Sequence, residues 1–194
     1  LLIAVNIRGY FGHFWQAVHQ SAFQVGSIIT TTGYATTDFN LWPEFSRTIL
    51  VLLMFVGACA GSTGGGIKVS RILIMLKTVK KEFVQLLHPK SIKKIQLDGK
   101  AVEHEVVRST NVFLIAYLLI FICSVLLVSL DNKDLVTTFT AVAATLNNIG
   151  PGLGEAGPLG NFSGFSNFSK LVMTFDMLDG RLEMFPLLHL FMRS

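Results

Sequence analysis

Charged side chains are scarce in this sequence. They make up 14% of its 194 residues, whereas 51% of the residues are hydrophobic and the mean hydropathy is +0.56. A soluble domain of this length normally carries about 25% charged residues. The shortage argues against an ordinary water-exposed surface and indicates a chain embedded in a membrane.

Cysteine is almost absent, and the residue clusters of enzymes and metal sites are missing. Cys59 and Cys123 lie in apolar runs, so we expect buried free thiols rather than a disulfide or a metal site. The five histidines show neither a zinc-ligand spacing nor a catalytic triad. They are His13, His19, His88, His104 and His189. We therefore expect no enzyme activity and no covalently bound cofactor.

A phosphate-binding loop is also missing. Residues 61–68, Gly-Ser-Thr-Gly-Gly-Gly-Ile-Lys, come close to one, but that motif requires lysine directly after its second glycine, followed by serine or threonine. Ile67 intervenes here, Val69 follows the lysine, and no buried β-strand precedes the glycines. These differences argue against an ATPase.

Basic residues are concentrated in one part of the chain. Residues 68–108 hold ten of the sixteen lysines and arginines but only four acids. The ten are Lys68, Arg71, Lys77, Lys80, Lys81, Lys90, Lys93, Lys94, Lys100 and Arg108. A nucleic-acid patch could have this composition, but the flanking apolar spans favour a cytoplasmic loop under the positive-inside rule. We expect residues 77–104 to be cytoplasmic and expect no nucleic-acid partner.

Two uncharged stretches have the length of a membrane span. Residues 109–130 are rich in Leu, Ile, Phe and Val and long enough to cross a bilayer. Residues 48–67 are also uncharged but contain a glycine-rich run from Gly57 to Gly66, and each glycine in a helix interior costs about 1 kcal/mol. Broken backbone at membrane depth persists only where it is buried in protein or lines a water-filled cavity. The run is therefore a candidate pore-side element.

Two further segments have the form of a short helix followed by a glycine-bearing loop. Residues 14–38 and 135–154 are too polar or too short to span, and each precedes a longer helix. The order helix, re-entrant loop, helix thus occurs twice, with Gly33 and Gly150 at equivalent points 117 residues apart. With the basic window in the cytoplasm, both loops enter from outside, where nearby acids would concentrate cations. These acids are Asp38, Glu44, Asp131, Asp134 and Glu155.

The glycine-bearing loops have the composition of a cation filter. Dehydrating a monovalent cation requires fixed carbonyl oxygens, and glycine lets the backbone turn them inward. Thr32-Gly33-Tyr34 partly matches the Thr-Val-Gly-Tyr-Gly filter of potassium channels, with Ala35 in place of the second glycine, which suggests a less discriminating filter. Residues 148–152 would be its counterpart. An ordinary glycine–proline turn is the alternative at either place.

Several ordered segments resemble the TrkH/KtrB family. Residues 23–38 resemble its third pore loop, and residues 57–68 resemble the intramembrane loop of its third repeat. Residues 146–154 resemble its fourth filter, and residues 180–183, Gly-Arg-Leu-Glu, resemble its final helix. The resemblance covers nearly the whole chain and is closer to the TrkH branch.

The resemblance implies a fold. The family is described as four helix–pore loop–helix repeats around one pore. The chain would then be an all-α membrane protein of potassium-channel-like type that carries two of the four repeats, the C-terminal half. The third repeat would occupy residues 1–100 and the fourth residues 105–194. Their segments would be the end of a first helix, pore loop 14–38, a broken second helix 44–87 and basic cytoplasmic loop 77–104, then first helix 106–130, pore loop 135–154 and second helix 168–192.

The resemblance also implies site residues and partners. The filter would comprise Thr31, Thr32, Gly33, Tyr34, Asn148, Ile149 and Gly150. A gate just beneath it would comprise Gly57, Gly61, Ser62, Thr63, Gly64, Gly65, Gly66 and Arg181. Potassium would be the substrate, held at the filter carbonyls. The partners would be membrane lipid, the N-terminal half of the same pore, a second copy in a homodimer, and a cytosolic TrkA-like nucleotide-binding ring.

Arg181 fits the gate on physical grounds. A charge inside a bilayer span costs several kcal/mol unless it faces a polar cavity, and an arginine below a cation site repels ions. The alternative is a structural ion pair. Asp176, Asp179 and Glu183 share one helix face that Arg181 does not, so a pair within the helix is poor and a pair with another helix stays open. The two aspartates depart from the family pattern, and we expect them either to line a wet cavity or to weaken the helix.

The expected function is potassium uptake across a bacterial inner membrane. The alternative is a non-conducting membrane scaffold, or a truncated fragment that kept the fold. Conduction requires filter glycines, and both Gly33 and Gly150 are present, which favours conduction. Leu1–Val5 is too short to span, so we expect the chain to begin in the last turns of a helix, as in a truncated product.

Overall fold

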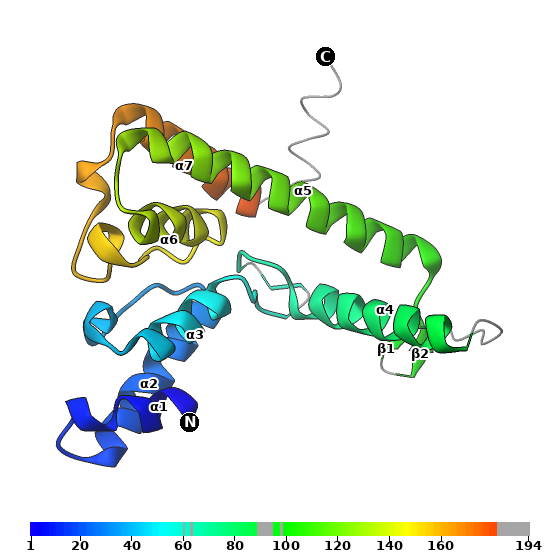
Figure 1. The fold of residues 1–194 in the computed structure, drawn as a ribbon, viewed down its shortest axis with the longest axis horizontal. Coiled ribbons are helices and arrows are strands. Elements are labelled where there is room, and N and C mark those ends of the chain that lie inside the picture. Colours follow the sequence, from blue (N-terminus) through cyan, green and yellow to red (C-terminus); the bar gives the residue numbers. More distant parts are fainter. Residues whose placement is uncertain (60, 63, 89–94, 98, 182–194) are drawn as a thin grey trace.

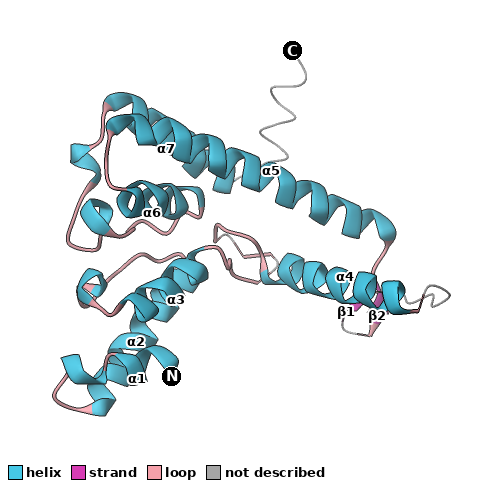
Figure 2. Cartoon of the chain, viewed as in Figure 1, coloured by secondary structure: helices cyan, strands magenta, loops and turns pink. Residues whose placement is uncertain are grey.

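The chain is mostly helical in the computed structural model, which describes residues 1–59, 61–62, 64–88, 95–97 and 99–181 (Figure 2). Its α-helices are α1 (Leu2–Asn6), α2 (Phe14–Ile29), α3 (Glu44–Met54), α4 (Val69–Leu87), α5 (His104–Val128), α6 (Leu135–Leu146) and α7 (Asn167–Arg181). Short 3-10 turns are η1 (Arg8–Tyr10), η2 (Phe39–Leu41), η3 (Ser129–Asp131), η4 (Gly154–Ala156) and η5 (Phe162–Gly164). The only strands in the described part are β1 (Gln96–Leu97) and β2 (Lys100–Ala101), which form an antiparallel hairpin.

The helices form two groups. Figure 1 shows α5 and α7 together with α6 beneath them, and α1, α2 and α3 as a second group. The groups meet where α3 contacts α6, and α4 runs out to one side and returns to α5 through the hairpin. The expected all-α fold is confirmed. The hairpin was not expected. Helix α4 forms the first part of the basic window and ends at Leu87.

The helical path from α3 to α4 is broken at the glycine-rich run, residues 57–66. Helix α3 ends at Met54 and α4 begins at Val69. Two backbone hydrogen bonds close the neck of the intervening loop, from Gly57 N to Ile67 O (2.8 Å) and from Ile67 N to Phe55 O (3.2 Å). The two ends of the loop are therefore held together at its base, and the glycine-rich loop projects from between α3 and α4.

Helix α6 is almost wholly buried between its neighbours. Small residues at Ala141, Ala143 and Ala144, all 0% exposed, allow the surrounding helices to approach closely. The Thr140 hydroxyl donates within the helix to Val136 O at 2.7 Å and accepts from Leu153 N of the following loop at 2.8 Å, whereas the buried Thr138 hydroxyl has no partner among the described residues. The ring of Phe139 on α6 packs edge-to-face against that of Phe121 on α5, with the two centroids 5.0 Å apart. This packing fixes α6, and with it the loop that follows.

The expectation of buried cysteines was wrong. Both Cys59 and Cys123 are exposed. Cys123 lies on α5, which within the described residues is the one helix long and apolar enough to cross a membrane, and whose outward side chains include Ile115, Leu119 and Ile122. Apolar neighbours in the sequence led to the expectation of burial, but α5 carries apolar side chains on its exposed face as well.

Candidate functional site

Both short helices end in the same backbone motif. Thr31 after α2 and Asn148 after α6 adopt the left-handed conformation, with φ of 55° and 54°. Two hydrogen bonds then close a Schellman motif at each helix end. They are Thr31 N to Ile28 O (3.1 Å) and Thr32 N to Ser27 O (2.9 Å), matched by Asn148 N to Thr145 O (3.0 Å) and Ile149 N to Ala144 O (2.9 Å). Each bond in one loop has its counterpart 117 residues away, as the predicted repeat requires.

The predicted filter glycines follow these motifs and bring the two loops together. Gly33 and Gly150 have φ of 78° and 110°, a region that other residues rarely adopt. A Cβ atom on Gly33 would overlap the carbonyl oxygen of Ile149. Glycine is therefore required at position 33 both by backbone conformation and by the closeness of the second loop.

A cavity of about 460 Å³ opens beside the paired loops. Its lining includes five of the seven predicted filter residues: Thr31, Thr32, Asn148, Ile149 and Gly150. Gly33 lies against Ile149 instead, and the Tyr34 carbonyl accepts a hydrogen bond from Ser27 Oγ at 2.6 Å. Helix α7 supplies a wall that the sequence did not indicate, formed by Lys170, Met173, Thr174 and Met177.

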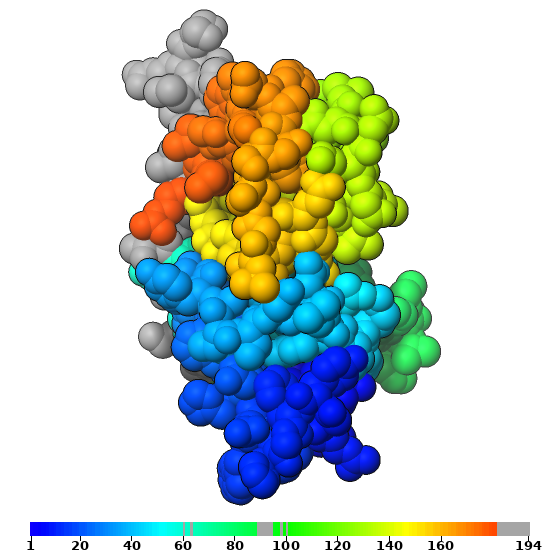
Figure 3. Space-filling model, turned by 90° about the vertical axis from the view of Figure 1, so that its left-hand side faces the viewer, coloured from blue at the N-terminus to red at the C-terminus, as the bar shows by residue number. Residues whose placement is uncertain are grey.

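The segments that follow the two glycines are joined by an amide clamp. Asn40 Nδ2 donates to Gly154 O, Gly154 N donates to Asn40 Oδ1, and both distances are 2.9 Å. In Figure 3 the light blue segment after α2 lies against the yellow and orange segment after α6. No pattern in a single sequence pairs residues 114 positions apart, so Asn40 was not among the predicted site residues.

We expect Asn40→Ala to lower the thermal stability of the chain. It removes two hydrogen bonds that cross between the repeats, each worth about 0.5–1.5 kcal/mol. Thermal unfolding followed by circular dichroism in detergent tests this. Asn161→Ala is the matched control, because its side chain bonds only to nearby Ser163. An equal loss in both variants would contradict a special role for the clamp.

The glycine-rich loop passes directly against the base of both filter loops. A Cβ atom on Gly65 would overlap the carbonyl oxygen of Asn147, and one on Gly64 would lie 3.2 Å from Thr31 Oγ1. Asn147 is itself fixed, because its Oδ1 accepts from Tyr117 Oη at 2.8 Å and its Nδ2 donates to Ala143 O at 2.7 Å. The residues predicted as a gate therefore contact the residues predicted as a filter, and Thr63 alone of the predicted gate residues lies outside the described residues.

Lys68 holds this loop from the side. Its side chain is 5% exposed, and its Nζ donates to the carbonyls of Ser62 (2.7 Å) and Gly64 (2.6 Å). Lys68 was not among the predicted site residues. The signal was present, because a lysine at the end of a 20-residue uncharged stretch must find polar partners if it is buried.

Helix α7 docks onto the base of the second filter loop. A Cβ atom on Gly180 would overlap the carbonyl oxygen of Leu146, and Asn148 Nδ2 donates to Met177 O at 3.0 Å. Arg181, at the end of the described helix, is exposed. The preceding turn and the glycine-rich loop share a small cavity lined by Gly66, Lys68, Arg71, Asp179 and Gly180 among others.

The two aspartates of α7 lie in different surroundings, with Asp179 at the small cavity and Asp176 buried. Asp176 is 2% exposed and accepts a hydrogen bond from Ser124 Oγ of α5 at 2.5 Å, so it lies in the packed interior rather than in a wet cavity. Asp179 is half-buried, and the helix continues unbroken through Arg181. The third acid of the expected face, Glu183, and residues 182–192 of the expected helix lie outside the described residues.

Comparisons with known proteins agree with this arrangement. A family model described as "TrkH: Cation transport protein" matches residues 12–194. The Trk system potassium uptake protein TrkH of Escherichia coli (strain K12) is 41% identical over 174 residues, 90% of this chain and 36% of that protein. TrkG of the same strain is 37% identical over 186 residues, 96% of this chain and 36% of that protein.

A solved structure gives the same result for the fold. The crystal structure of the potassium transporter TrkH from Vibrio parahaemolyticus superposes with a TM-score of 0.89 at 39% identity, covering 97% of this chain and 40% of that one. The chain thus spans about a third of the length of the curated relatives it matches. Its helical membrane-transporter fold is established, and the chain belongs to the TrkH family of cation transport proteins.

Proposed function

We propose that this chain forms one half of a potassium-conducting pore in a bacterial inner membrane. The observation that carries the proposal is the repeated turn-and-glycine backbone at residues 31–33 and 148–150, brought together beside one cavity. Rings of backbone carbonyls replace the hydration shell of a cation. Two of four such loops would supply half of a ring. The other half would come from a segment equivalent to the part of the relatives that this chain does not cover.

The gate in this proposal is the glycine-rich loop with Arg181. The loop lies against the base of both filter loops, through Gly64 and Gly65, and Lys68 fixes two of its carbonyls. Arg181 ends the described helix next to Gly180, which packs on the base of the second filter loop. A guanidinium below a cation site raises the electrostatic barrier to permeation, and moving it would lower that barrier.

Topology and partners form a further part of the proposal. Residues 77–104 would lie in the cytoplasm and both pore loops would face outside, following the basic window. The whole protein would act as a homodimer with a cytosolic TrkA-like nucleotide-binding ring.

The test of the proposed function is rubidium uptake in bacteria that lack potassium uptake systems. We expect uptake by this chain joined to the N-terminal half of a family member, and none by the chain alone, because two loops cannot enclose a four-sided pore. A joined protein that reaches the membrane folded and still takes up no rubidium would contradict conduction and favour a scaffold.

We also expect the basic window to bind the cytosolic ring. Replacing the lysines at positions 77, 80, 81, 90, 93, 94 and 100 with glutamine should weaken co-purification with the ring, because each positive charge adds attraction to an acidic partner. Lys133 and Lys170 lie on the proposed outer side and serve as control sites. Unchanged co-purification after the window substitutions would reject this contact.

A further inference from the structure

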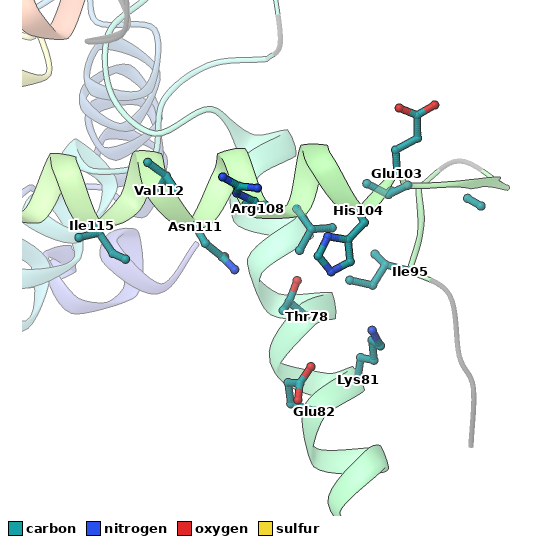
Figure 4. A pocket seen from close by; sticks show the side chains of 13 residues that line it. Thr78, Lys81, Glu82, Ile95, Glu103, His104, Arg108, Asn111, Val112 and Ile115 are labelled. Carbon is teal, nitrogen blue, oxygen red and sulfur yellow. The ribbon is translucent and has the colours of Figure 1, made fainter. Parts of the chain in front are cut away.

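A cavity of about 710 Å³ lies at the junction of α4, the β-hairpin and the start of α5, far along the chain from the paired loops (Figure 4). Its volume is within the range of roughly 300–1,000 Å³ that is typical of small-ligand sites. Its lining contains Thr78, Lys81 and Glu82 from α4, and Glu103, His104 and Arg108 from the beginning of α5. The site has no role in the proposed pore.

One end of this cavity is basic. Lys81 is half-buried, and among the described residues neither Lys81 nor Arg108 has a hydrogen bond or an ion pair. Figure 4 shows the His104 ring and the Lys81 side chain directed into the same space, whereas Glu103 points away from it. Glu82 is the acid that remains beside the cavity, and it too forms no ion pair in the described part. The basic end is therefore free to take an anionic group.

The other end is apolar and lies along the membrane span. Val112 and Ile115 line it, and both are exposed. They belong to the uncharged stretch that begins directly after Arg108. At 1.5 Å per helical residue, Ile115 lies about 10 Å deeper along α5 than Arg108. The cavity thus changes from basic to apolar over the distance that separates a lipid headgroup from its acyl chains.

We propose that this cavity binds one anionic phospholipid of the cytoplasmic leaflet. Its phosphate would contact Lys81, with His104 as a further donor, and Arg108, beside Val112 in Figure 4, would add attraction from further along α5. Its acyl chains would run along Val112 and Ile115. Basic pockets between helices on the cytoplasmic side are suited to anionic headgroups. The surrounding residues 68–108 carry six more basic than acidic side chains (ten minus four), which adds attraction over the range of the screening length.

A free phosphate compound offers the same anionic chemistry as a headgroup. The apolar wall distinguishes the two, because a soluble phosphate would leave Val112 and Ile115 without a partner. The proposal uses the cytoplasmic placement of residues 77–104 and does not depend on ion conduction. Its failure and the failure of the proposed function are therefore separate results.

The test is native mass spectrometry of the chain purified from bacterial membranes, followed by titration with phosphatidylglycerol and with phosphatidylethanolamine. We expect one retained phosphatidylglycerol per chain. Lys81→Gln with Arg108→Gln should weaken its binding roughly 30-fold, since each basic residue near an anionic lipid is worth about fivefold in affinity. Lys80→Gln with Arg8→Gln removes the same charge outside the cavity and should weaken binding much less than the cavity pair does. If the first pair loses helical content, Lys81→Gln alone should weaken binding about fivefold.

Four results would overturn the proposal. Equal retention of phosphatidylethanolamine would remove the anionic preference. Displacement of the lipid by inorganic phosphate or glycerol phosphate would indicate a soluble ligand. Equal loss of lipid in the cavity pair and in the control pair would indicate general charge attraction, and a loss of dimer in place of lipid would indicate a protein contact.

Discussion

Gly33→Ala is expected to reduce rubidium uptake by the joined protein at least tenfold. Alanine at a φ of 78° is strained by about 1–2 kcal/mol, and its Cβ would overlap the carbonyl oxygen of Ile149. The obstructing atom is backbone, so it cannot rotate away. Either the first loop leaves its conformation or the second loop moves, and both outcomes displace the carbonyls that are proposed to bind the ion.

The matched control for this substitution is Gly26→Ala. Gly26 lies inside α2, with no atom within 4 Å of a Cβ placed on it. Alanine is favoured over glycine in a helix by about 1 kcal/mol, so this variant should retain uptake and gain stability. Unchanged uptake in Gly33→Ala, measured at equal membrane expression, would contradict the role given to the contact between the loops.

Lys68→Met is expected to raise rubidium leak in the absence of the regulatory ring about tenfold. Methionine has similar length but no donors, so the carbonyls of Ser62 and Gly64 lose the hydrogen bonds that hold the loop in place. A buried carbonyl without a partner costs about 1–3 kcal/mol, and 1.4 kcal/mol is a factor of ten in an equilibrium. The loop should therefore leave its closed position more often.

Lys80→Met provides the comparison for this prediction. It removes an exposed lysine from the interior of α4, the helix that Lys68 caps. Leak of joined protein reconstituted into vesicles, measured with and without the ring, separates the two variants. A leak in Lys68→Met no larger than in Lys80→Met would show that Lys68 only supports folding.

Segments with a strong local signal could be predicted from the sequence. The uncharged stretch 109–130 lies within α5 and η3. The glycine run interrupts the helix between Met54 and Val69, because glycine is unfavourable in a helix interior. The matching positions of Gly33 and Gly150 followed from two loops of similar composition, and the backbone conformations agree.

Features that depend on distant contacts could not be predicted. The Asn40–Gly154 clamp and the Ser124–Asp176 hydrogen bond join residues far apart in the chain, and neither pair has a local pattern. The position of Asp176 was misjudged because the acid was considered on its own helix, without the hydroxyl of α5. The exposure of Cys123 could not be predicted because α5 is apolar on its exposed face as well as on its buried face.

The most direct measurement of the central claim is block of the pore by a thiol reagent. The joined protein would carry Thr32→Cys, with Cys59→Ala and Cys123→Ala to remove the exposed native thiols, and a cationic methanethiosulfonate would be added outside during rubidium uptake. Thr32 lines the cavity beside the paired loops, so the account predicts block that high potassium slows. Thr48→Cys, on the exposed side of α3, should not be blocked. Modification of Thr32→Cys without block, or block that potassium does not slow, would contradict a cation path through these loops.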